Sequence, residues 1–86
     1  MIDNLVTRNA KQLGEALRRL RKQKSMTQTE VGQRTNLRQA TVSTVEAGDP
    51  GTQLKTLFDV LVALDLELVV RQRPKAGPTS LEDLFS

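Results

Sequence analysis

The side chains best suited to chemistry in this chain are amides, hydroxyls and one guanidinium gathered in a single short stretch. Around position 40 the apolar residues recur with a helical period and leave the polar ones on the other side. Small donors, acceptors and methyl groups of this kind match the base edges exposed in the major groove of duplex DNA. We therefore predict that this face contacts bases, and its residues are Arg38, Gln39, Ala40, Thr41, Ser43 and Thr44.

Two short helices joined by a tight turn must position these residues. Thr27 and Glu30 have the spacing of a capping box, which predicts that a first helix begins at residue 28. Asn36 stands where that helix must end, because Asn tolerates the left-handed backbone better than any residue except Gly. After a turn over 36–38, the second helix runs from Gln39 to a stop at Gly48. A helix of this length needs packing behind it to be stable in water.

The same residues resemble the Cro and phage-repressor (XRE) helix-turn-helix family. The resemblance is strong over about a quarter of the chain, and its residues are Thr27-Gln28-x-Glu30-Val31-Gly32, Asn36-Leu37, Gln39-Ala40-Thr41-Val42-Ser43 and Glu46-x-Gly48. It implies an all-α, compact, four- to five-helix, lambda-repressor-like domain that binds double-stranded DNA. It also implies that Gln28 anchors the DNA backbone and that Arg21 pairs with Glu46 to fix the recognition helix.

This chain departs from the family pattern at two positions. Thr35 stands where an apolar residue is common, and a hydroxyl there weakens the core slightly. Arg38 stands where a Ser or Thr cap is common, which exchanges a capping hydroxyl for a contact to phosphate or guanine.

Composition narrows the possible functions. The chain of 86 residues has no Cys and no His, which argues against zinc sites, thiol chemistry and His-dependent catalysis, and we expect no enzyme activity, no metal and no cofactor. Residues 1–38 hold nine basic and three acidic side chains, whereas residues 39–86 hold four and seven. A basic half is typical of a phosphate-binding surface. No signal peptide and no long apolar run is visible, so we expect a cytoplasmic protein without a membrane partner.

Two further helices flank the motif. An apolar stripe at residues 13, 16, 17 and 20 predicts a helix over 9–24. After the Asp-Pro-Gly turn of residues 49–51, Thr52 is placed to cap a helix from Gln53 to about Leu64. We predict that its inner stripe is Leu54, Leu57, Phe58, Leu61 and Leu64.

The period then changes to alternation, which favours a strand over a continuing helix. A lone strand has no partner within the chain, so the same strand of a second copy is the economical solution. We predict a homodimer that pairs through Leu66, Leu68, Val69, Val70 and Arg71, with a palindromic operator.

A Pro- and Gly-containing linker separates the last residues from the domain. This organisation predicts an N-terminal arm (1–8), a DNA-binding and dimerisation domain (9–73) and a flexible tail (74–86). The apolar residues of the tail would dock on a partner protein, and they are Leu81, Leu84 and Phe85.

The domain, strand and tail together resemble HipB-type antitoxins. That resemblance implies a repressor of its own operon that also holds a HipA-like, kinase-like toxin. Two alternatives stay open at the level of the sequence. One is a stand-alone XRE-family or phage-type repressor without a toxin partner, and the other is a protein-interaction adaptor that keeps the fold without binding DNA.

Overall fold

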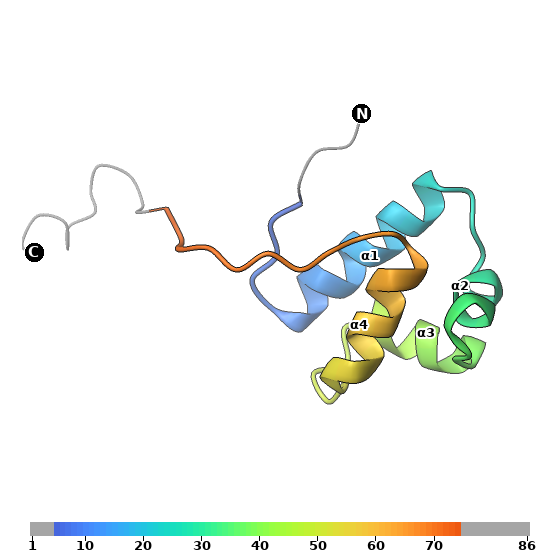
Figure 1. Ribbon diagram of the computed structural model, residues 1–86. Coiled ribbons are helices and arrows are strands. Elements are labelled where there is room, and N and C mark those ends of the chain that lie inside the picture. Colours follow the sequence, from blue (N-terminus) through green and yellow to red (C-terminus); the bar gives the residue numbers. More distant parts are fainter. Residues whose placement is uncertain (1–4, 75–86) are drawn as a thin grey trace, which may run out of the picture.

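Four helices make up the regular structure of residues 5–74, which are the residues that the computed structural model describes (Figure 1). They are α1 (Ala10–Gln23), α2 (Gln28–Thr35), α3 (Gln39–Glu46) and α4 (Leu54–Ala63). The predicted all-α architecture is confirmed over this range. Helices α2 and α3 pack against each other, α4 packs on α2, and α1 packs on α3.

Local capping defines the first two helices. The Asn9 side chain accepts a hydrogen bond from the backbone N–H of Gln12 (2.8 Å) at the start of α1. At the start of α2, the Thr27 hydroxyl accepts from the Glu30 N–H (3.1 Å) and the Glu30 carboxylate accepts from the Thr27 N–H (2.8 Å). The predicted capping box is thus confirmed. Asn36 ends α2 with a left-handed backbone (φ 63°), also as predicted.

The predicted cap of α4 is wrong. The helix begins at Leu54 with Gln53 as its N-cap residue, and no side chain caps it. Thr52 lies one residue too early to reach the free amides of the first turn. Its hydroxyl and that of Thr35 are buried and lack a hydrogen-bond partner among the described residues. Buried polar groups without partners reduce stability, which agrees with the expectation that Thr35 weakens the core.

The core lies where the four helices meet. Its buried apolar side chains are Leu17, Val31, Val42, Val45, Leu57, Val60, Leu61, Ala63 and Leu64. The inner stripe predicted for α4 is only partly right, because Leu54 is 67% exposed and Phe58 is 44% exposed. Together with Val62 they follow an i, i+4, i+8 spacing, which lies roughly 100° around the helix axis from the buried face. The molecule buries only one face of α4 and leaves this second apolar face open.

After α4 the chain turns at Asp65 (φ 59°), and the Leu66 N–H donates to the Leu61 carbonyl (2.8 Å). Residues 66–74 then run beside α1 without regular secondary structure (Figure 1). No strand occurs within residues 5–74 of this single chain. A strand needs a partner edge, so the pairing of residues 66–71 across a dimer stays a prediction. Residues 75–86 of the predicted tail (74–86) lie outside the described residues.

Helices α1 and α3 approach closely at Gly14. A Cβ atom built there would lie 2.5 Å from the Glu46 carbonyl oxygen and 2.7 Å from that of Val45. Both obstacles are backbone atoms, so relief requires the two helices to move apart. Only a residue without a side chain fits this crossing.

We predict that Gly14→Ala destabilises the domain by about 1 to 3 kcal/mol, because overpacking displaces α3 from α1. Chemical denaturation monitored by circular dichroism measures the change. The matched control is Gly51→Ala in an exposed turn, where the nearest atom is a side-chain oxygen of Asp49 at 3.3 Å and the expected effect is small. Equal stability of the two variants would contradict the close crossing.

Candidate DNA interface

The predicted recognition face of α3 points away from the core. Val42 and Val45 are buried on the inner side, whereas the opposite side is open. The exposed residues are Arg38, Gln39, Ala40 and Thr44, and the partly exposed ones are Thr41 and Ser43. All six predicted residues are therefore at least partly exposed, along α3 or directly before it. Whether they contact DNA stays a prediction.

Arg21 and Glu46 form the predicted ion pair. Arg21 Nε donates to Glu46 Oε2 (2.6 Å) and Arg21 Nη2 donates to Glu46 Oε1 (3.0 Å). The remaining arm of the guanidinium, Nη1, donates to the Met26 carbonyl (2.8 Å) in the loop before α2. Both residues are buried, with exposures of 8% and 7%. The hydrogen bond to Glu46 raises the pKa of Arg21 above its ordinary value, so the guanidinium stays charged.

Glu46 also binds the first residue of α2. Gln28 Nε2 donates to Glu46 Oε1 (3.0 Å), and Gln28 Oε1 in turn accepts a hydrogen bond from Gln39 Nε2. Sequence reasoning missed both of these bonds, although it placed each residue in the site. The available signal was that Gln28 and Gln39 are each the first residue of their helix, and the motif sets these two helix starts side by side. The polar face of α3 is thus connected to the buried ion pair.

Two residues of the predicted face have distinct local roles. The Thr44 hydroxyl donates to the Ala40 carbonyl one turn earlier (3.0 Å), so its proton is already engaged within α3. Arg38 is the N-cap residue of α3 but makes no side-chain capping bond. Arg38 is exposed at the start of α3, and its contact to phosphate or guanine stays a prediction.

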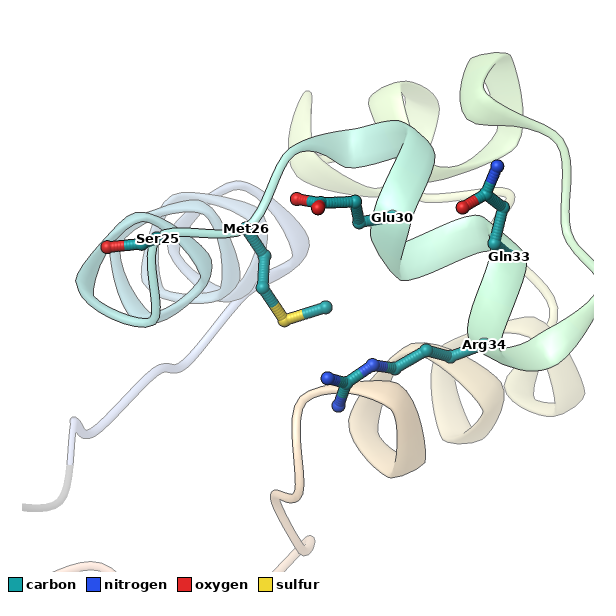
Figure 2. A pocket seen from close by; sticks show the side chains of 5 residues that line it. All are labelled: Ser25, Met26, Glu30, Gln33 and Arg34. Carbon is teal, nitrogen blue, oxygen red and sulfur yellow. The ribbon is translucent and has the colours of Figure 1, made fainter.

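A shallow pocket of about 290 Å³ lies on a separate surface, between the loop before α2 and the outer side of that helix (Figure 2). It is lined by Ser25, Met26, Glu30, Gln33 and Arg34. Two of these side chains already have structural roles: Glu30 belongs to the capping box, and Arg34 Nη1 donates to the Ala63 carbonyl at the end of α4 (3.1 Å). Figure 2 shows Arg34 extending from α2 toward that end of α4. The pocket therefore lies between side chains that stabilise the fold.

Residues 5–74 contain no cluster of three His, Cys, Asp or Glu side chains that could hold a metal ion. No helix in the same range has both the length and the apolar character needed to cross a membrane.

We predict that Arg21→Ala destabilises the domain by about 3 to 5 kcal/mol, because it leaves the Glu46 carboxylate buried and unpaired. A double-mutant cycle with Glu46→Gln, measured by denaturant unfolding, should give a coupling of about 1 to 3 kcal/mol. Lys55 and Asp59 supply the control, since their i, i+4 bond of 3.0 Å is exposed on the Lys55 side. Their coupling should stay below about 1 kcal/mol. A coupling near zero between Arg21 and Glu46 would show that their ion pair does not stabilise the domain.

Comparison with known proteins places the chain in a family. Residues 12–73 match the family model described as a helix-turn-helix domain. Antitoxin HipB of Escherichia coli strain K12 is 34% identical over 71 residues, which span 83% of this chain and 81% of the relative. Antitoxin HipB of Escherichia coli O6:H1 strain CFT073 is 32% identical over 71 residues, which span 83% of this chain and 76% of the relative.

Solved structures that resemble this chain are also HipB structures. A structure of a HipB-O4 20mer complex matches with a TM-score of 0.79 at 28% identity, over 83% of this chain and 100% of the other. A structure of a HipA-HipB-O2-O3 complex matches with a TM-score of 0.78 at 28% identity, over the same shares. The fold, the capping box, the turn and the buried ion pair thus coincide with a family match over most of the chain. This chain belongs to the helix-turn-helix family that includes the antitoxin HipB.

Proposed function

We propose that this protein is a sequence-specific repressor that binds double-stranded DNA and serves as the autoregulating antitoxin of a HipBA-like toxin-antitoxin system. The observation that carries the proposal is the exposed polar face of α3 on a scaffold that buries a charged pair directly behind it. A helix whose inner side is core and whose outer side is small amides and hydroxyls fits the major groove. The relatives with this fold include HipB in a complex with a 20mer and HipB in a complex with HipA.

The roles proposed for the interface follow from side-chain chemistry. Gln39, Ala40, Thr41, Ser43 and Thr44 face the groove, where amides suit adenine and methyl groups suit thymine. Gln28, at the N-terminus of α2, contacts the DNA backbone, where a helix start favours an anion. Arg38 gains nothing from the helix dipole at the start of α3, because a cation there opposes it. A contact to phosphate or guanine is the better explanation for a guanidinium in that place.

A second copy of the chain completes the proposed assembly. Val69 and Val70 are exposed, and Val70 is 90% exposed, which leaves apolar area unprotected in the monomer. These residues border an apolar groove that runs between α1 and the segment after α4. Pairing of residues 66–71 across a two-fold axis covers this area and satisfies the free backbone groups. The two recognition helices would then meet a palindromic operator at half-sites about 34 Å apart.

A HipA-like kinase toxin is the proposed protein partner, with the tail residues Leu81, Leu84 and Phe85 as its contact. We also propose that the protein acts in the cytoplasm, at the nucleoid, and that it has no catalytic role. The stand-alone repressor remains the second candidate, because every DNA-facing residue would be the same in both. Coexpression with the genomic neighbour separates them: co-elution of the two proteins supports the antitoxin, and separate elution supports the lone repressor.

We predict that Gln39→Ala weakens binding to the preferred operator by about 1 to 3 kcal/mol and binding to random duplex DNA much less. Fluorescence anisotropy with both duplexes, at one fixed salt concentration, measures the difference. The control variant is Gln33→Ala, which changes an exposed amide on α2 away from the recognition face. Equal losses on the two duplexes would reassign Gln39 to phosphate contact.

We predict that Val69→Pro converts a dimer into a monomer, because proline removes a backbone N–H from the proposed strand. Light scattering at micromolar concentration should show the loss, and operator affinity should fall because the half-sites are no longer linked. Val69→Thr keeps the β-branched shape and the N–H, and it should remain dimeric. A monomeric wild-type protein would refute the assembly.

We predict that deletion of residues 79–86 leaves operator binding intact and weakens the complex with the coexpressed toxin. The deletion removes Leu81, Leu84 and Phe85 but touches none of the proposed DNA-binding residues. Anisotropy with operator DNA and co-purification with the toxin measure the two effects. A matched control replaces Glu82 and Asp83 by Gln and Asn, which retains the apolar residues. Undiminished toxin binding by the deletion variant would dismiss the tail as the contact.

A further inference from the structure

The one sulfur atom in residues 5–74 belongs to Met26, in the loop between α1 and α2. The residue is partly exposed and lines the pocket of about 290 Å³ on the outer side of α2. Figure 2 shows its side chain reaching from the loop into this pocket, with the sulfur and the terminal methyl group directed toward Arg34. A thioether in an open pocket of this kind is within reach of a small oxidant.

The same side chain also contributes to the core. Met26 packs against the cluster of buried apolar side chains, although it is itself only partly buried. Its thioether therefore has apolar neighbours on one side and the open pocket on the other. Oxidation to the sulfoxide would add a polar oxygen to a group that packs against the core. A polar group in that place favours a shift of the loop toward water.

The backbone of Met26 connects this loop to the ion pair behind the recognition helix. Its carbonyl accepts from Arg21 Nη1 (2.8 Å), and its N–H donates to the Arg21 carbonyl (3.2 Å). Arg21 in turn donates to both carboxylate oxygens of Glu46, the last residue of α3. The next residue along the chain, Thr27, is the N-cap of α2. A shift of the loop would therefore remove a hydrogen bond from Arg21 and move the start of α2.

We propose that Met26 is a redox-sensitive modification site, at which conversion of the thioether to the sulfoxide weakens DNA binding reversibly. The oxidant is hydrogen peroxide. One of its oxygen atoms passes to the sulfur, which gives up two electrons, and the O–O bond breaks to leave water. A methionine sulfoxide reductase, with thiols as the reductant, removes that oxygen as water and forms a disulfide from the thiols. The inference rests on the proposed DNA-binding function, because the affinity that changes is that of the α3 face.

The test treats the full-length protein with hydrogen peroxide and locates the sulfoxide by peptide mass spectrometry. A duplex selected from a randomised library by the untreated wild type serves as the operator. Fluorescence anisotropy gives the affinity before oxidation, after oxidation, and after treatment with a dithiol and the two methionine sulfoxide reductases, one for each sulfoxide epimer. Thermal unfolding by circular dichroism shows whether each sample is folded at the assay temperature.

Two control variants separate Met26 from other effects of peroxide. Met26→Leu keeps an apolar side chain at position 26 and retains Met1, so any effect of oxidation at Met1 persists in it. A double variant adds Gln23→Met, which moves the sulfur to an exposed position at the end of α1. Met has nearly the same helix propensity as Gln. A third variant, Met26→Gln, introduces a polar group at position 26 without any oxidation.

We expect oxidation to lower the operator affinity of the wild type about tenfold, because Arg21 loses a charge-assisted hydrogen bond, and we expect the reductases to restore it. Met26→Leu and the double variant should keep their affinity under the same peroxide treatment. Met26→Gln should show the loss from the start.

Three results would overturn the inference. One is a Met26 thioether that survives the peroxide concentration that oxidises position 23 of the double variant. The second is a wild-type sulfoxide with unchanged operator affinity, and the third is global unfolding of the oxidised protein. Failure of the untreated wild type to select any duplex would instead refute the proposed function itself.

Discussion

The bidentate pair between Arg21 and Glu46 is the interaction on which the rest of the structure depends. It joins α1 to the end of α3, and through the Met26 carbonyl it also holds the loop that leads into α2. A buried charge is stable only when its partners are in place. Displacement of any of these three segments would therefore leave a buried charge without its partner, which is unfavourable. The pair therefore acts as a positional constraint as well as a contact, and it determines where the recognition helix lies relative to its scaffold.

Close approach of the helices makes that constraint possible. Gly14 lets α1 lie directly against the backbone at the end of α3, which brings Arg21 within reach of Glu46. The capping box starts α2 beside the same carboxylate, so that Gln28 can join it. Helix α3 has only eight residues and would not be stable alone. Its stability therefore comes from the packing behind it, and two of its outer residues, Gln39 and Thr44, also make hydrogen bonds within the domain.

Small size explains what the domain leaves exposed. A chain of this length buries only about 60 to 65% of the surface of its unfolded state, and its four short helices share one core. Apolar area consequently remains open on the segment after α4 and on the second face of α4 formed by Leu54, Phe58 and Val62. The segment after α4 also has backbone groups without hydrogen-bond partners within residues 5–74, and its residues alternate as in a strand. Pairing with a second copy of the chain would satisfy these groups.

The amino-acid sequence by itself determined the features that depend on near neighbours. The capping box joins Thr27 and Glu30, which are three positions apart, and the left-handed backbone at Asn36 depends on that residue's own type. The helices themselves follow from the spacing of the apolar residues. The Arg21–Glu46 pair was available only through the family resemblance. Tertiary structure alone decided the bonds of Gln28 to Glu46 and Gln39 and the exposure of Leu54 and Phe58. It also decided that the buried hydroxyl of Thr52 has no hydrogen-bond partner within residues 5–74. These depend on how far α4 and α3 are rotated against the other helices, and rotation is set by packing in three dimensions, which no local pattern encodes.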